Sequence, residues 1–135
     1  MSSLIWIYPW SEKIEIINLK NLEEKPQLYL GERDAQFAIV KITPREDPYN
    51  RLVQTYYLVY VEDSYGYQMP FVISESDYPK YNAYVGKTAV FKLKGEIGPE
   101  LMHPPNKLIT NIIVSKQVDP YAREYCRIYI VLRDL

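Results

Sequence analysis

Few residues in this chain have the side chains that catalysis or metal binding usually needs. His103 is the only histidine and Cys126 the only cysteine. A zinc site needs several Cys or His ligands, so the supply is too small. A Ser or Cys nucleophile paired with a histidine base would have to use His103, which lies in a proline-rich stretch. We therefore predict no catalytic residue, no metal site and no cofactor, and a protein that is not an enzyme.

Carboxylates leave one enzymatic alternative open. The acidic residues Glu62, Asp63, Glu75 and Asp77, together with Lys87, could hold Mg²⁺ as a nuclease does. Hard cations prefer oxygen ligands, so the residue types are suitable. The spacing matches no nuclease motif, however, and acids in turns and connectors are more often solvated. A metal-dependent nuclease is the third and most distant hypothesis.

Length and composition favour a single globular domain. The chain has 135 residues, 47% of them hydrophobic, and a net charge of −1. No apolar run approaches the ~18–20 residues that span a bilayer, and no basic segment precedes the apolar N-terminal residues, so we expect neither a membrane span nor a signal peptide. One cysteine suits a reducing, cytoplasmic setting. The many Tyr, Ile, Lys and Glu give a thermophile-like composition.

Alternating apolar residues predict that the middle of the chain is a β-sheet. Residues 52–62 and 67–73 are rich in Val, Leu, Thr and Tyr and flank turn residues, so they predict a hairpin. Strands are also predicted for residues 35–42, 88–97 and 108–118. In the first of these, Phe37, Ile39 and Lys41 are expected on one face, and the intervening residues with Ile42 on the other.

The two ends of the chain are predicted differently. Residues 1–34 read as a β extension that covers the main sheet, with strands at 4–8, 13–17 and 27–30 and a turn or single helical turn at 21–26. The tail begins with Asp119-Pro120, an N-cap residue followed by proline, and an apolar stripe at helical spacing follows. We predict a helix over 119–135, although the β-branched run at 128–132 would also suit a strand.

The order of strands in residues 35–118 resembles the OB-fold. The turn Glu62-Asp63-Ser64-Tyr65-Gly66 looks like that family's acidic-glycine turn between strands two and three. Residues 85–95, Val-Gly-Lys-Thr-Ala-Val-Phe-Lys-Leu-Lys-Gly, look like its entry into strand four. The resemblance implies a mainly β, five-stranded Greek-key barrel, with a connector after the third strand that is often helical. Residues 1–135 then form one domain, with the barrel at 35–118.

The resemblance also implies a ligand, single-stranded DNA or RNA laid across the second and third strands. Tyr56 and Tyr60 are expected on the outer face of strand two, opposite a Val-rich core face. The candidate nucleic-acid-binding residues are Tyr56, Tyr60 and Tyr67 for stacking on bases, and Lys41, Lys87, Lys92 and Lys94 for phosphates.

Two observations weigh against nucleic-acid binding. Tyrosines pack cores and sheet edges about twice as often as they would stack on bases here, and lysines on outer strand faces commonly serve solubility. Residues 35–118 also carry nine Lys and Arg against eight Asp and Glu, a net charge of only +1. The alternative is a protein-interaction subunit or homo-oligomer that uses Trp6, Tyr8, Trp10 and the C-terminal helix.

Overall fold

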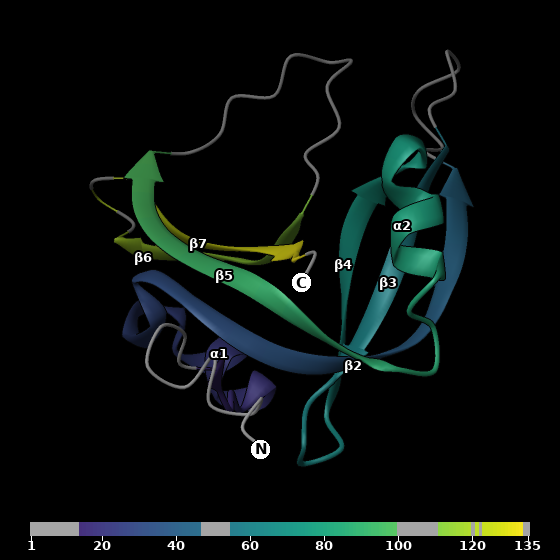
Figure 1. The fold of residues 1–135 in the computed structure, drawn as a ribbon. Coiled ribbons are helices and arrows are strands. Elements are labelled where there is room, and N and C mark those ends of the chain that lie inside the picture. The colour runs from purple at the N-terminus through teal and green to yellow at the C-terminus, as the bar shows by residue number, and fades with distance from the viewer. Residues whose placement is uncertain (1–13, 47–54, 100–110, 120, 122, 134–135) are drawn as a thin grey trace, which may run out of the picture.

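A computed structural model describes residues 14–46, 55–99, 111–119, 121 and 123–133 (Figure 1). This part of the chain is mainly β, with seven strands, two short α-helices and two 3₁₀ helices. In chain order the elements are β1 (Ile14–Glu15), α1 (Leu19–Glu24), η2 (Pro26–Tyr29), β2 (Gly31–Glu46), β3 (Thr55–Glu62), β4 (Gln68–Ser74), η3 (Glu75–Asp77), α2 (Tyr78–Asn82), β5 (Thr88–Pro99), β6 (Ile112–Asp119) and β7 (Glu124–Leu132).

The long strand β2 organises the sheet. Its first half, residues 31–38, pairs with β5, and its second half, residues 38–46, pairs with β3, both antiparallel. The strand order is β4-β3-β2-β5-β7-β6, and β1 adds to β2 in parallel. The sheet curls into a half-barrel (Figure 1). Its two outermost strands approach at Asn111, whose N–H donates to Val72 C=O and whose C=O accepts from Ile130 N–H.

A β-bulge lies in β2 at the point where its partner strands change. Ile39 pairs with Val61, but the next paired residue is Lys41, opposite Tyr60, so Val40 is the extra residue. The bulge reverses the alternation of faces: Ile42 packs against the core, whereas Lys41 is exposed. The prediction that Lys41 shares a face with Phe37 and Ile39 is therefore wrong, because an inserted residue changes the phase of a strand.

The concave side of the sheet holds an aromatic core. The Phe91 ring lies 5.8 Å from that of Phe37 and 6.0 Å from that of Phe71, measured between centroids. Helix α2 covers β4, because Tyr81 packs edge-on against Phe71 and is itself buried. The core is extended by Leu19 and Leu22 of α1, both fully buried.

A close backbone contact holds η2 against β5. A Cβ atom on Gly95 would come within 2.2 Å of the carbonyl oxygen of Tyr29. Glycine is therefore required at this position, because any side chain would push the 3₁₀ helix off the sheet.

The hairpin and the three other strand predictions in residues 35–118 are confirmed within the described residues. The connector at 74–87 contains η3 and the one-turn helix α2. The predicted strand at 27–30 is wrong, since residues 26–29 form η2. Among the described residues of the N-terminal segment, the strand β1 covers residues 14–15 and is shorter than the predicted strand at 13–17. The predicted strand at 4–8 lies outside the described part.

The C-terminal helix is also wrong, because residues 124–132 form β7, which adds to the five strands expected. Cys126, Ile128, Ile130 and Leu132 all point into the core, so the period-two alternation prevails over the helical stripe. Asp119, expected as a helix N-cap, instead accepts the N–H of Tyr121 on its side chain at 2.9 Å in the β6–β7 turn.

Candidate nucleic-acid interface

Tyr56 and Tyr60 lie on the outer face of β3. The alternate residues Val59 and Val61 are completely buried, and Tyr57 packs against the core and stacks on Tyr78 at 4.3 Å. The rings of Tyr56 and Tyr60 are partly exposed. Four residues separate them, a distance of about 13 Å along an extended strand.

Each of these tyrosines faces a basic residue across the strand pair. Lys41 pairs with Tyr60 and Arg45 with Tyr56. The Lys41 ammonium nitrogen lies 4.7 Å from the centroid of the Tyr60 ring, a cation–π contact. We call this surface the tyrosine face. It comprises the outer side chains of Lys41, Thr43 and Arg45 on β2, Tyr56, Leu58 and Tyr60 on β3, and Pro70, Val72 and Ser74 on β4.

Lys87 lies close to one end of the tyrosine face. Its main chain borders β2, where the Ile39 N–H donates to the Lys87 carbonyl at 3.0 Å. Its neighbour Gly86 donates to the Ile39 carbonyl at 2.8 Å. These bonds fix the 85–87 turn beside the bulge, two residues from Lys41, and the Lys87 side chain is exposed.

Tyr67 is not part of the tyrosine face. Its hydroxyl donates a hydrogen bond to Glu23 Oε2 of α1, and its ring packs against the core. This hydrogen bond, followed by burial and the charges of Glu23 and Glu24, raises the pKa of Tyr67. Its hydroxyl thus joins the hairpin to α1, on the opposite side of the sheet from Tyr56 and Tyr60.

Lys92 and Lys94 lie on the other half of the sheet, among acidic residues. The Lys92 ammonium is 3.5 Å from Glu32 Oε2 and faces Asp34 across the strands. Lys94 faces Glu32, while Asp34 forms a 2.6 Å ion pair with Arg133. The two lysines share the outer face of β5 as expected, and Lys92 is paired with Glu32. Both are separated from the tyrosine face by the change of partner strand along β2.

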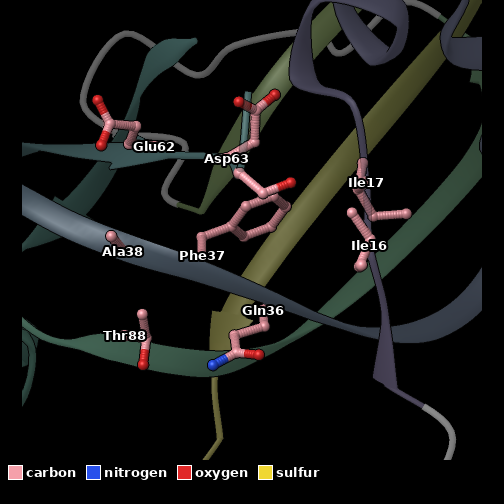
Figure 2. A pocket seen from close by; sticks show the side chains of 9 residues that line it. Ile16, Ile17, Gln36, Phe37, Ala38, Glu62, Asp63 and Thr88 are labelled. Atoms are coloured by element: carbon pink, nitrogen blue, oxygen red, sulfur yellow. The ribbon is translucent and has the colours of Figure 1, made fainter. Parts of the chain in front are cut away.

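A pocket that the sequence did not indicate lies at the edge of β2. Its volume is about 280 Å³ (Figure 2). We call it the edge pocket; it is lined by Ile16, Ile17, Gln36, Phe37, Ala38, Glu62, Asp63, Ser64 and Thr88. From the sequence, Glu62 and Asp63 are turn residues and possible Mg²⁺ ligands, and nothing marks them as part of a pocket. The pocket depends on where β1 and β3 stop along β2, and no local motif carries that information.

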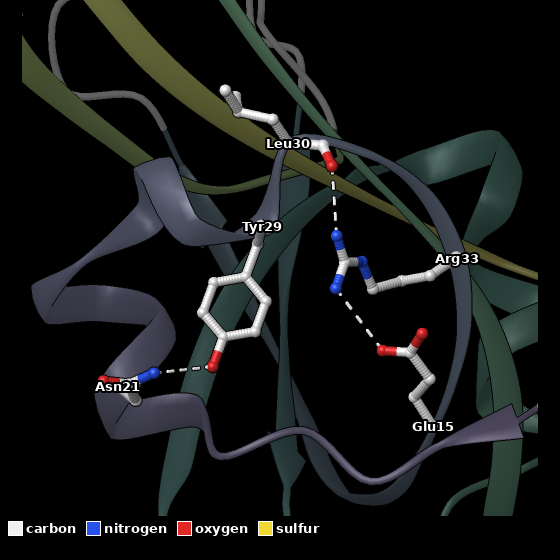
Figure 3. Close-up of polar contacts among 5 residues, drawn as sticks. All are labelled: Glu15, Asn21, Tyr29, Leu30 and Arg33. Carbon is white, nitrogen blue, oxygen red and sulfur yellow. Dashed lines mark hydrogen bonds and ion pairs between the residues drawn. The ribbon is translucent and has the colours of Figure 1, made fainter.

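Polar contacts fix the wall of the edge pocket formed by the segment after β1. Arg33 of β2 reaches Glu15 at 3.4 Å and the Leu30 carbonyl at 3.0 Å (Figure 3). The side chain of Asn21 donates to the Tyr29 hydroxyl at 2.7 Å and joins α1 to η2. These contacts hold residues 15–30 as a fixed layer beside β2.

Asp63 has a structural role at the opposite wall. Its Oδ2 accepts the Leu19 N–H at 2.8 Å, and its Oδ1 accepts the N–H groups of Tyr65 and Tyr67, both at 2.9 Å. Both oxygens are therefore committed to the main chain, and the carboxylate ties the β3–β4 turn to the start of α1.

The described residues contain no group of three or more His, Cys, Asp or Glu placed to hold a metal ion. The four acids considered for Mg²⁺ are thus not gathered into such a group. His103 lies outside the described residues. None of the helices in the described part of the chain has the length and apolar character needed to cross a bilayer.

Comparison of the chain with protein-family models, with curated proteins and with solved structures gives no match.

Proposed function

We propose that the protein binds single-stranded DNA or RNA on the tyrosine face, without catalysing a reaction. The contact between Lys41 and the Tyr60 ring carries this proposal. It places a cation over an aromatic ring, and these are the two groups that a nucleotide needs for its phosphate and its base. Arg45 and Tyr56 repeat the pair further along the same two strands.

The energies favour a base over the lysine as the partner of the Tyr60 ring. An exposed cation–π contact contributes about 0.5–1 kcal/mol, whereas stacking of a base on an aromatic side chain contributes about 1–3 kcal/mol. An incoming base can therefore displace Lys41 from the ring. The released ammonium stays within reach of the phosphate of the same nucleotide, which adds a charge contact.

The fold supports a relationship to the OB-fold as part of the same proposal. The long strand β2 pairs with both β3 and β5, and a short helix precedes β5. In OB-fold proteins the ligand lies across the second and third strands, which would be β3 and β4 here. The strand β7 between β5 and β6 departs from the five-strand pattern.

The test is a fluorescence-anisotropy titration of labelled single-stranded DNA and RNA at two salt concentrations. The double substitution Tyr56→Ala and Tyr60→Ala should weaken binding at least tenfold, because two stacking platforms are lost. Tyr65→Ala with Tyr121→Ala is the matched control, since both rings are exposed and lie in hairpin turns away from the face. No binding at low salt, or equal affinity of the two double variants, would refute the proposal.

A second candidate function is a protein interface, favoured by exposed apolar side chains. Ile16 is 75% exposed and Tyr121 98% exposed. The residues expected to form this interface, Trp6, Tyr8 and Trp10, lie outside the described part. Removal of residues 1–11 should abolish assembly under this hypothesis and leave strand binding intact under the first. Light scattering after gel filtration gives the mass of both forms.

A further inference from the structure

The edge pocket adjoins the tyrosine face along β3. Glu62 follows Tyr60 by two residues, so the two side chains leave the same side of the strand about 7 Å apart. Glu62 pairs with Ala38 of β2, and Ala38 pairs with Thr88 of β5. All three line the pocket (Figure 2). A strand that passes over Tyr56 and then Tyr60 thus reaches the pocket next.

The pocket exists because one edge of β2 is left uncovered over two residues. On this edge, β1 pairs with β2 as far as Ala35, and β3 pairs from Ala38 onward. Gln36 and Phe37 lie in the gap between them. Phe37 supplies an apolar floor, and the segment after β1 supplies an apolar wall through Ile16 and Ile17.

Two carboxylates line the pocket: Asp63, whose oxygens accept main-chain N–H groups, and Glu62. Glu62 is half-buried, and its Oε1 accepts from the Gln68 side chain at 3.1 Å. Within the described part of the chain, its Oε2 has no hydrogen-bond partner. A carboxylate repels phosphate. The pocket next to Tyr60 is therefore suited to a base of the nucleic acid and unsuited to its sugar-phosphate backbone. A lining that combines apolar and polar side chains matches a flat heterocycle, which has apolar faces and a polar edge.

We propose that the edge pocket takes one nucleobase and selects a base with an exocyclic amino group, cytosine over thymine or uracil. This inference rests on the proposed function. An ionised carboxylate is an acceptor only, and it pairs with the N4 amino group of cytosine. Thymine presents its O4 acceptor at the equivalent position, so a thymine there would set two acceptors against each other.

The experiment scans a single cytosine through a labelled oligothymidine. We expect one register to bind about ten- to a hundredfold more tightly than the all-thymine strand, the gain from one charge-assisted hydrogen bond. Glu62→Gln should remove this gain at that register, because the amide no longer presents an acceptor-only group. Glu32→Gln is the matched control, since it removes the same charge from the other half of the sheet.

A second variant tests the pocket by changing its volume and leaves Glu62 in place. Ala38→Leu should fill the pocket and abolish the cytosine preference, so that cytosine-containing and all-thymine strands bind this variant equally. If every strand binds equally regardless of cytosine position, the pocket inference is wrong and the proposed function stands. If no strand binds at low salt, the proposed function itself fails. A preference that persists in Glu62→Gln would also overturn the assignment of Glu62.

Discussion

The Lys41 ammonium differs from that of Lys92 in what surrounds it. Lys41 contacts an aromatic ring, whereas Lys92 lies beside Glu32. A lysine that neutralises a phosphate releases a counterion, and each such contact adds to the salt dependence of affinity. A lysine already paired with a carboxylate contributes much less.

We therefore expect Lys41→Met to lower the slope of log affinity against log salt by about 0.7–1, the contribution of one phosphate contact. Lys92→Met should leave the slope unchanged, although it removes the same charge. The measurement is the anisotropy titration repeated at four or more salt concentrations. Equal slopes for the two variants would mean that Lys41 contacts no phosphate.

The sequence locates the tyrosines at this scale but not all of their partners. Alternation along β3 is enough to place Tyr56 and Tyr60 opposite Val59 and Val61. Lys41 was placed on the wrong face because nothing local marks Val40 as a bulge. The bulge follows from β2 exchanging one partner strand for another, which is a property of the assembled sheet.

At the scale of elements, α2 is tied to the far end of the chain by one hydroxyl. The Tyr81 hydroxyl accepts the Leu132 N–H of β7 at 3.1 Å. Burial is the main cause that raises the pKa of Tyr81, so the hydroxyl stays protonated. This bond joins α2 to β7.

Tyr81→Phe should lower the free energy of unfolding by about 1–3 kcal/mol, because the Leu132 N–H is left buried without an acceptor. Tyr65→Phe, at an exposed ring in the β3–β4 turn, should change it by less than about 0.5 kcal/mol. Urea denaturation followed by circular dichroism measures both. A negligible effect of Tyr81→Phe would show that water replaces the lost hydroxyl.

Strands with clear alternation could be predicted from the sequence, and the tail could not. Residues 121–132 carry both a helical stripe and a period-two alternation, so local spacing alone leaves two solutions. The strand is favoured over the helix because β7 pairs with the edge of β5 from Phe91 to Pro99. Such a long-range partner is invisible in a window of a dozen residues.

At the scale of the whole molecule, Cys126 reports on global unfolding. The thiol lies in the core between β5 and β6, and burial raises its pKa, while the charge of Arg127 acts in the opposite direction. The thiolate is the reactive form. The native thiol is therefore protected twice, by its inaccessibility and by its protonation.

We expect Cys126 to react with a thiol reagent at pH 8 at least a hundredfold faster in denaturing urea than in native buffer.

Because the folded pKa of Cys126 is raised, the neutral thiol's contribution to the free energy of unfolding is complete below the unfolded pKa. It is lost as the pH rises through the folded value. Unfolding midpoints at pH 7 and pH 10 test this sign. Fast labelling of the native protein would indicate local opening of β7.

The division of β2 between two partner strands has a consequence for synthesis. As the chain emerges from the ribosome, β2, β3 and β4 are available before β5. The edge of β2 residues 31–38 that pairs with β5 is therefore unpaired until β5 has been made. A chain that ends near Lys87 leaves this edge to solvent and open to pairing with another chain. Pairing with residues 88–95 of β5 is what removes that open edge.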